Sequence, residues 1–404
     1  DPQDLVLDVF CGTGMTGVAA SQMAGGERYC VECELSTAAS FISNGFRLVP
    51  SLHSARSQAC RIVKALQTQY GWMYETNHCG WDASERDPRK RVNNPTSDLI
   101  GKVNFVVWSD VFICSECGGE VVFWESAVSF EECCVLDTFR CAQCNAVLHK
   151  KRLQKAMHTV FDAALSKPII VTKRKPVLIN YTYDRKRYEK EPDCHDREVT
   201  KTIDEMEISE WYPIDRMPEG DESRRNDDAG ITHIHHFYTK RNLHVLSKAR
   251  KIVREDPRLL FWFTATLPWC GRENRLHIGN YFGRKGGQIT SLRGTWYVPS
   301  LSVETNAIER LRLRIDSSLV DTGIKSRSTI ISTQSATQLP QLLSKSADYI
   351  FIDPPFGDNL MYSELNCIWE SWLKVKTNTR PEAIINRTQE KGLMDYKRLM
   401  EHAF

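Results

Sequence analysis

Leu5-Val-Leu-Asp-Val-Phe-Cys-Gly-Thr-Gly14 is the stretch that decides the fold of this 404-residue chain. Its first six residues form a short apolar run of the kind that is buried inside a parallel sheet. The glycines that follow favour a tight turn, because a residue without a Cβ adopts backbone conformations that other residues avoid. A pattern of small residues typical of a helix comes next. This order predicts the first strand, turn and helix of an α/β domain.

A second strand is predicted at 28–33, and an acidic residue, Glu34, stands at its end. Ser36 then provides the N-cap of a second helix. Glycines after the first strand and an acid after the second suit a nucleotide, because the helix N-terminus faces an anion and the carboxylate accepts ribose hydroxyls. Alone, the glycines are weak support, since tight turns in other α/β proteins contain them too.

The α/β pattern returns near the C-terminus, after a long segment of different character. The predicted elements there are helices at 306–315, 339–345 and 394–404 and strands at 328–333 and 349–353. We therefore predict one α/β domain, formed by 1–50 and 301–404, that is interrupted by a folded α+β insertion at 51–300. Inside the insertion we expect a helix at 55–69, a strand-like run at 259–266 and a charged stretch, poor in strands, at 173–228.

The two ends of the sequence suggest a piece of a longer protein. Asp1 is not a methionine, and Phe404 lies inside a predicted helix without a stop signal. We expect an incomplete sheet of four strands, with the strand at 349–353 at an unpaired edge and further strands after Phe404.

Two Cys-x-x-Cys pairs predict a metal site inside the insertion. They are Cys114-Ser-Glu-Cys117, followed by two glycines, and Cys141-Ala-Gln-Cys144, followed by an asparagine. Four thiolates at this spacing fit a tetrahedral zinc ion and leave no open coordination position, so the site is expected to be structural. We predict a zinc ribbon at 108–150.

Two other groups of potential metal ligands receive a structural interpretation. Cys30 and Cys33 lie in a predicted strand, where residues three apart point to opposite faces. The segment Ile231–His236 carries three histidines, but no acidic or cysteine partner is spaced for them along the sequence. A histidine-bearing edge or interface is therefore the preferred interpretation of that segment.

Asp353-Pro-Pro-Phe356 stands at the end of the last predicted strand. Pro354 and Pro355 have no N–H donor and a fixed φ, so the carbonyls of this segment are held rigidly outward. The Asp353 carboxylate and the Pro354 carbonyl can accept the two hydrogens of an exocyclic amine, while Phe356 stacks on the ring that bears it. An amine held in this way has its lone pair drawn out of conjugation and can attack a methyl sulfonium.

Asp8-Val-Phe-Cys-Gly-Thr-Gly14 and Asp353-Pro-Pro-Phe356 resemble motifs I and IV of the amino-methyltransferases, which methylate adenine N6 or cytosine N4 in DNA with S-adenosylmethionine. More closely, the chain is similar to the large adenine-specific DNA methylases that carry a zinc ribbon within the catalytic domain. The similarity recurs at 34–38, 294–299, 353–363 and 386–389. It implies a Rossmann-like sheet that binds S-adenosylmethionine.

The resemblance also implies roles for single residues. The cofactor-binding residues would be Asp8, Phe10, Cys11, Gly12, Thr13, Gly14 and Glu34, the last of them on the ribose. The catalytic residues would be Asp353, Pro354, Pro355 and Phe356. The family usually has an acidic residue in the turn before Asp-Pro-Pro, where this chain has Ser335, so that role stays open. Aspartate at the first motif position favours adenine, and C5-cytosine methylation is disfavoured because none of the 16 prolines precedes a cysteine.

The charge balance and the lengths of the apolar runs limit the kinds of partner that the protein can have. With 53 basic and 51 acidic residues the formal net charge is only +2, which gives no global sign of a polyanion but allows a local basic groove. The apolar runs are far shorter than the roughly 20 residues that cross a bilayer, so we expect a soluble, cytoplasmic protein. The resemblance implies double-stranded DNA and restriction or phage-defence subunits as partners.

Two alternatives stay open. RNA guanine-N2 methyltransferases also carry Asp-Pro-Pro-Phe and use the same amine chemistry. The chain can also be a nucleic-acid-binding subunit whose methylase site is silent, although Asp8, Gly12, Gly14 and Asp353 are all intact. A purely structural zinc-ribbon adaptor fits least, because it leaves the motifs at both ends without a purpose.

Overall fold

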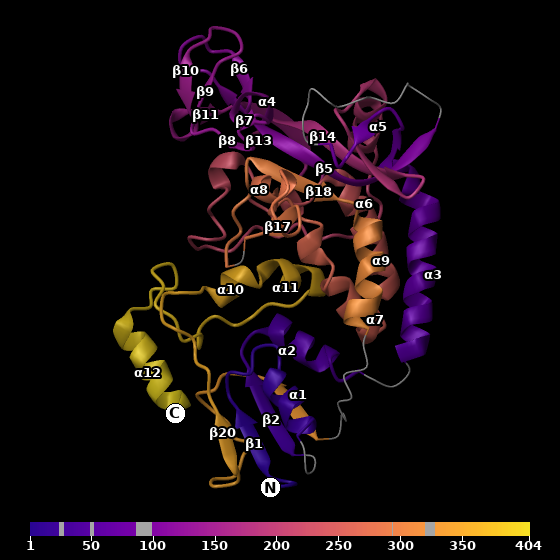
Figure 1. Cartoon of the computed structure of the whole chain (residues 1–404). Helices are drawn as coiled ribbons and strands as arrows, with labels where there is room; N and C mark the ends of the chain where they lie inside the picture. The colour runs from indigo at the N-terminus through magenta and orange to yellow at the C-terminus, as the bar shows by residue number, and fades with distance from the viewer. Residues whose placement is uncertain (24–27, 49–51, 86–98, 293, 320–327) are drawn as a thin grey trace.

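The computed structural model describes residues 1–23, 28–48, 52–85, 99–292, 294–319 and 328–404. Two sheets of different kind dominate the architecture (Figure 1). A small parallel sheet lies near both ends of the chain, and a large antiparallel sheet lies at the opposite end of the molecule, with helices between them. This confirms the mixed α/β class that the sequence predicts.

The parallel sheet has four strands in the order β19-β2-β1-β20. They are β1 (Leu5–Asp8), β2 (Tyr29–Glu34), β19 (Thr329–Thr333) and β20 (Tyr349–Phe351). The helices α1 (Met15–Ser21) and α2 (Thr37–Gly45) follow β1 and β2. Because β2 and β20 lie on opposite sides of β1, the strand order reverses there, and such switch points are where open α/β sheets bind ligands.

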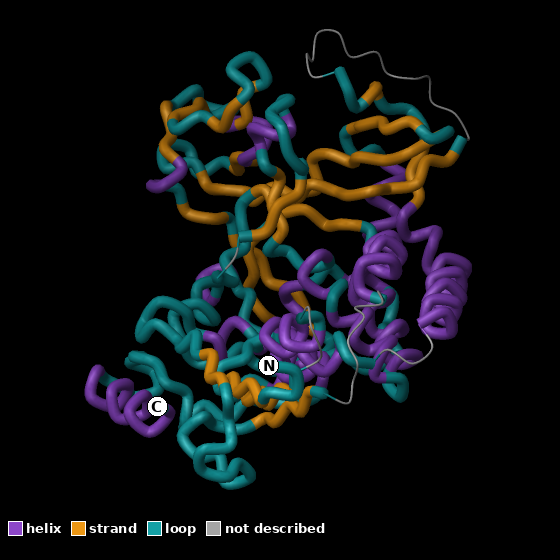
Figure 2. The backbone as a smooth tube through the Cα atoms, turned by 60° about the horizontal axis from the view of Figure 1, so that its bottom comes forward, coloured by secondary structure: helices purple, strands orange, loops and turns teal. Residues whose placement is uncertain are grey.

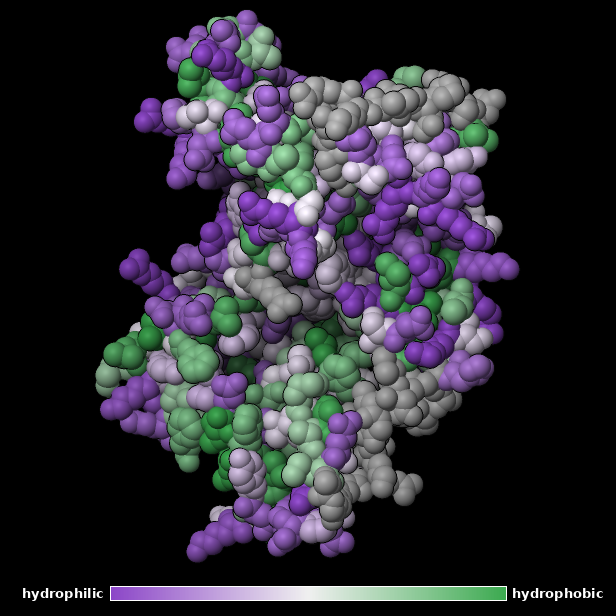
Figure 3. All heavy atoms as spheres, viewed as in Figure 1, coloured by the Kyte–Doolittle hydropathy of each residue, from purple (hydrophilic) through white to green (hydrophobic). Residues whose placement is uncertain are grey.

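β20 forms one edge of this sheet among the described residues, as the sequence predicts. All three of its residues are exposed, although parallel strands are normally covered on both faces. In Figure 3 hydrophobic side chains gather over the lower part of the molecule, where Figure 1 shows the parallel sheet and α12 (Leu393–Ala403).

The antiparallel sheet is organised around one 14-residue strand, β5 (Ile100–Ile113), which pairs with β14 (Arg174–Tyr183) and β18 (Leu301–Thr305). Its other strands are β3 (Glu75–Asn77), β4 (Trp81–Asp82), β6 (Glu120–Val122), β11 (Gln154–Lys155), β15 (Lys186–Lys190), β16 (Asn274–Leu276) and β17 (Ile289–Ser291). The chain therefore returns to the parallel sheet only at β19. The domain boundaries at 50 and 300 stay a prediction.

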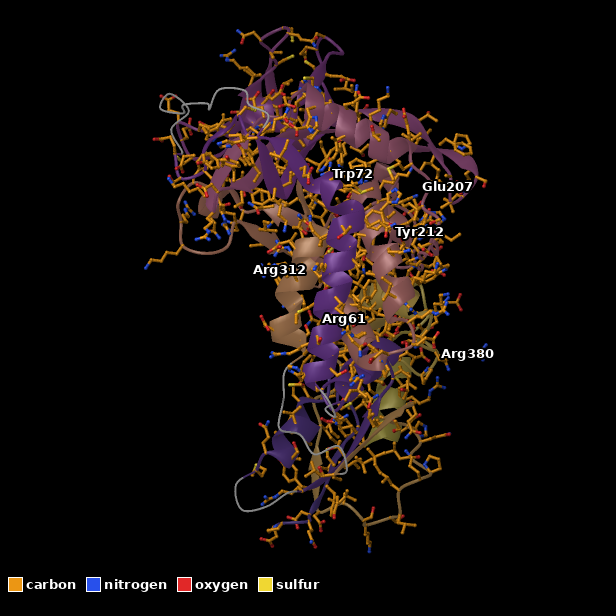
Figure 4. The ribbon with its side chains drawn as sticks, turned by 90° about the vertical axis from the view of Figure 1, so that its right-hand side faces the viewer. Arg61, Trp72, Glu207, Tyr212, Arg312 and Arg380 are labelled. Atoms are coloured by element: carbon orange, nitrogen blue, oxygen red, sulfur yellow. The ribbon has the colours of Figure 1, made fainter. Side chains whose placement is uncertain are left out.

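Four helices pack between the sheets: α3 (Leu52–Tyr70), α6 (Lys240–Val253), α7 (Pro257–Thr264) and α9 (Ala307–Ser318). Figure 4 shows α3 beside α9, with Arg61 on the first and Arg312 on the second, and Trp72 just beyond the end of α3. Trp262, Phe263 and Leu311 are fully buried in this layer and fix its core.

Outside the helical layer strands and loops prevail, as Figure 2 shows, and most of the remaining elements are short. They include α4 (Phe123–Ala127), α5 (Cys194–Glu205), α8 (Ile278–Tyr281), α10 (Tyr362–Leu365), α11 (Cys367–Leu373), β7 (Val128–Ser129), β8 (Cys134–Val135), β9 (Thr138–Arg140), β10 (Val147–His149), β12 (Met157–Asp162) and β13 (Lys167–Thr172). None of the described helices combines the length and apolarity needed to cross a membrane.

Three predictions about local structure were wrong. The charged stretch at 173–228 contains β14 and β15. The five residues of β14 from 177 to 181 are buried in the sheet, and this burial outweighs the charged residues on either side of them. The run at 259–266 is helical: the Asp256 carboxylate caps the Arg258 N–H at 2.9 Å and Pro257 starts the helix α7. The segment 339–345 forms turns instead of a helix.

Candidate functional site

A cavity of ≈ 1070 Å³ extends along the parallel sheet, from Val6, Arg28 and Tyr349 near the amino ends of its strands to Asp8, Glu34 and Asp353 at or beyond their carboxyl ends. It brings together residues that the sequence predicts from both ends of the chain: Asp8, Phe10, Cys11, Gly12, Thr13, Glu34, Asp353 and Pro355. Ser335 lines it as well. Gly14, Pro354 and Phe356 are predicted site residues that do not appear in its lining, and their roles stay predictions.

The glycine turn is fixed by Asp8, whose side chain is buried. One carboxylate oxygen accepts the Phe10 N–H at 3.0 Å and the other accepts the Thr16 hydroxyl at 2.5 Å. Burial raises the pKa of Asp8. Gly12 has φ +53° and a Cβ built on it would meet nothing within 4 Å, so this glycine keeps the cavity open.

Gly14 serves a different purpose. It has φ +83°, and an added Cβ would lie 1.9 Å from the Ser43 hydroxyl of α2. Glu32 of β2 is also close to Gly14. Its carboxylate accepts the Gly17 N–H at 2.7 Å and forms a buried ion pair with Arg47. The glycine at this position therefore allows α1 and α2 to pack closely over β2.

Glu34 bridges the glycine turn and the start of α2. Its two carboxylate oxygens accept the backbone N–H groups of Gly12 and Ser36, each at 2.8 Å. Burial raises the pKa of this carboxyl, and the two N–H donors oppose that effect. Each oxygen keeps a further lone pair, so the carboxylate can accept hydroxyl hydrogens from a ligand in the cavity.

The loop after β20 leaves two acceptors open. The carbonyls of Pro355, Phe356 and Gly357 accept hydrogen bonds from the Tyr396 hydroxyl, the Asn359 N–H and the Ile385 N–H at 2.7, 3.3 and 3.2 Å. Among the described residues, no group donates to the Asp353 carboxylate or the Pro354 carbonyl. The Phe356 ring is 67% exposed.

Sequence reasoning missed two residues of the cavity, Tyr362 and Asn366. Tyr362 lines the cavity together with Asp353 and Glu34, and burial raises the pKa of its hydroxyl, with a further contribution from the charges of these two carboxylates. The Asn366 amide donates to the Ser36 hydroxyl at 2.8 Å. The only signal for Tyr362 is its place in the stretch 353–363, which resembles the methylase family, because the position of α10 depends on contacts that are distant in the sequence.

The four predicted cysteine ligands come together as a cluster that can bind a metal such as zinc. The Sγ atoms of Cys114 and Cys144 are 3.7 Å apart, and those of Cys117 and Cys141 are 3.8 Å apart. A tetrahedral site with Zn–S bonds of about 2.3 Å has edges of about 3.8 Å, so these distances suit zinc without rearrangement.

The two Cys-x-x-Cys turns have the same backbone geometry. In the first, Gly118 N–H donates to the Cys114 carbonyl at 3.0 Å, and in the second, Asn145 N–H donates to the Cys141 carbonyl at 2.9 Å. Gly118 and Asn145 both have a left-handed backbone, which these residue types tolerate. Backbone N–H groups at Cys144 and Gln143 lower the pKa of Cys141 to about 6, which favours a thiolate ligand.

The histidine segment has an acidic partner that sequence spacing could not show. The Asp162 Oδ2 atom at the end of β12 lies 2.9 Å from His235 Nε2 and 2.8 Å from His236 Nε2. These three groups are close enough to hold a metal ion. However, the Thr232 N–H donates to His236 Nδ1 at 3.2 Å, which puts the ring proton on Nε2, toward Asp162. We therefore assign a hydrogen-bonded cluster that holds the β12–β13 hairpin.

This cluster predicts a loss of stability in acid. Burial lowers the pKa of His235, and burial together with His235 lowers that of His236 to about 4, from an ordinary value of 6.5. Between these values the unfolded chain binds more protons, so the free energy of unfolding should fall as pH drops from 6.5 toward 4. Urea unfolding should show a weaker pH dependence in His236→Gln. His402→Gln, an exposed site, should match the wild type, and an unchanged dependence in His236→Gln would refute the assignment.

Neither family models nor curated proteins nor solved structures give a match to this chain. Its function therefore has to be argued from the cavity and the cysteine cluster.

Proposed function

We propose that the protein is an S-adenosylmethionine-dependent methyltransferase that acts on the N6 amine of adenine in DNA. The observation that carries the proposal is the pair of open acceptors, the Asp353 carboxylate and the Pro354 carbonyl. They stand beside a large cavity whose other end has the glycine turn and the acid of a nucleotide site. An amine with two hydrogens is the group that two adjacent acceptors suit.

The cofactor end of the cavity fits a nucleoside. S-adenosylmethionine would supply an electrophilic methyl group on its sulfonium. Glu34 would accept the hydroxyls of the ribose, and Gly12 leaves room for close approach of the ligand to the backbone. Asp8 holds the turn in place through Phe10 and Thr16, so the site is formed in advance.

At the other end, Asp353 and Pro354 would orient the adenine amine. The base has to leave the DNA stack to reach them, because Asp353 lines the cavity and Pro354 follows it directly in the chain. Phe356, exposed next to them, offers a ring on which the base can stack. The oriented amine would attack the methyl carbon: one N–C bond would form, the S–C bond of the sulfonium would break and leave the thioether S-adenosylhomocysteine, and the amine would give up one proton to solvent. Orientation and proximity supply most of the acceleration, without a covalent enzyme intermediate.

The insertion would supply DNA binding, with the four cysteines holding a structural zinc ion. Figure 3 shows the molecule hollowed between its upper end, where Figure 1 shows β9 and β10, and its lower end with α12. A recess between the ribbon and the catalytic segment is where a duplex could reach both. The exposed basic residues Lys151 and Arg152 follow β10 and suit phosphate contacts, whereas the Lys150 ammonium lies over the Phe123 ring.

Glu34→Gln tests the cofactor end. The amide keeps the shape of the side chain but replaces one acceptor oxygen with a donor that faces backbone N–H groups. We expect the Kd for S-adenosylmethionine to rise by about tenfold or more, the equivalent of about 1.4 kcal/mol, in isothermal titration. Glu401→Gln, on the surface of α12, should bind as the wild type does. Equal affinity of Glu34→Gln and wild type would contradict the ribose role, and detection of N6-methyladenine in treated DNA tests the function itself.

A further inference from the structure

The Asp353–Phe356 loop, which carries the two open acceptors, can form few backbone hydrogen bonds of its own. Pro354 and Pro355 have no N–H group, so two consecutive residues cannot donate backbone hydrogen bonds. The strand β20 has already ended at Phe351. The direction of the Pro354 carbonyl therefore depends on contacts made by the carbonyls that follow it.

A side chain from the last helix makes the first of these contacts. The Tyr396 hydroxyl donates to the Pro355 carbonyl at 2.7 Å, across 41 residues of sequence. A carbonyl is fixed by such a bond in both distance and direction, because the donor lies near the plane of the C=O group. The Pro355–Phe356 peptide plane, next to the Pro354 carbonyl, is thereby held by a side chain of α12.

The helix that carries Tyr396 is itself anchored. At its start, the Asp395 carboxylate accepts the Gly392 N–H at 3.1 Å. Just before it, the Lys391 ammonium donates to the carbonyls of Thr379 and Glu382 at 2.6 and 2.7 Å. On its inner side, Leu399 and Ala403 line the cavity. The helix α12 thus forms one wall of the cavity. Its first turn, which contains Tyr396, is held in place by these hydrogen bonds.

We propose that Tyr396 is a positioning residue of the methyl-transfer site. Its hydrogen bond to Pro355 fixes the Asp353–Phe356 loop, so that the Asp353 carboxylate and the Pro354 carbonyl point together at the amine. Tyr396 touches no reacting atom in this arrangement. The inference rests on the proposed function and adds a residue that neither the motif nor its spacing indicates, since α12 follows the motif by 37 residues and more.

Tyr396→Phe isolates the hydroxyl, because the ring and its packing remain. Loss of one neutral hydrogen bond of about 1–1.5 kcal/mol that acts on orientation should lower kcat about tenfold. The Kd for S-adenosylmethionine and the Tm should stay at the wild-type values, because Glu34 and the glycine turn do not contact Tyr396. Tyr29→Phe, an exposed tyrosine that does not line the cavity, is the matched control and should leave kcat unchanged.

The possible outcomes distinguish failure of the Tyr396 role from failure of the proposed methyltransferase function. A fall in kcat alone, with Kd and Tm unchanged, supports the positioning role. Wild-type kcat in Tyr396→Phe overturns the role and leaves the proposed function intact. A fall in Tm or in cofactor affinity that parallels the fall in kcat also overturns it, because the hydroxyl is then a general structural contact. Absence of methyl transfer by the wild type, with the cofactor bound, overturns the proposed function and the inference with it.

Discussion

Asp353→Ala is expected to lower kcat for methyl transfer by about a hundredfold to a thousandfold, the range seen when one preorganised hydrogen-bonding group is removed from an active site. The variant loses the carboxylate that accepts an amine hydrogen, and the Pro354 carbonyl alone cannot fix the direction of the amine lone pair. Single-turnover transfer at saturating S-adenosylmethionine measures this effect. The Kd of the cofactor should change little, because Asp353 makes no hydrogen bond to the described residues that form the glycine turn.

Asp358→Ala is the matched control for this prediction. Asp358 lies in the same loop and is also exposed, but it does not line the cavity. Its variant should transfer methyl groups at the wild-type rate. If Asp353→Ala and Asp358→Ala have equal rates, Asp353 is not the acceptor of the amine and the assignment of the catalytic end of the cavity is wrong.

Cys141→Ser is expected to remove the bound metal and to unfold the ribbon. Structural zinc contributes about 10–16 kcal/mol of apparent binding free energy to small domains that depend on it. The β9–β10 hairpin is a separate two-stranded sheet, and besides the cysteine cluster it is held by Phe139 and Leu148, which pack into the core that contains Phe123. Metal analysis should find one zinc ion per wild-type chain and close to none in the variant, and limited proteolysis should cut the variant between 114 and 149.

Two controls separate metal loss from loss of a thiol. Cys133→Ser and Cys60→Ser replace exposed cysteines outside the cluster and should keep the metal. Cofactor binding should also persist in Cys141→Ser, because the cluster lies outside the parallel sheet that carries the cavity. A wild-type chain that is purified without metal, takes up none from zinc solutions and yet resists proteolysis would contradict the prediction.

The parallel sheet could be predicted from the sequence because its information is local. The strand Leu5–Asp8 belongs to a short apolar run that ends in a turn, Thr329–Thr333 is rich in β-branched residues, and the order of glycines and Glu34 fits a βαβ unit. The four cysteines could be predicted for the same reason, since each turn is specified by four or five consecutive residues.

Other features depend on distant contacts and could not be predicted. The Asp162 carboxylate meets His235 and His236 only because the β12–β13 hairpin folds back on them across more than 70 residues. The contact from Tyr396 to Pro355 has the same origin. The helix α7 was mistaken for a strand because Leu259–Phe263 is a short continuous apolar run, which fits a buried strand as well as a helix, and the Asp-Pro start is the signal that favours a helix.

Transfer of labelled methyl groups from S-adenosylmethionine to mixed DNA, followed by nucleoside analysis, tests the central claim most directly. The proposal predicts label in N6-methyladenine with the wild type and about a hundredfold less with Asp353→Ala. Label in RNA guanine, with none in DNA, would contradict the choice of substrate. No transfer to either, by a protein that binds no cofactor, would contradict the methyltransferase proposal as a whole.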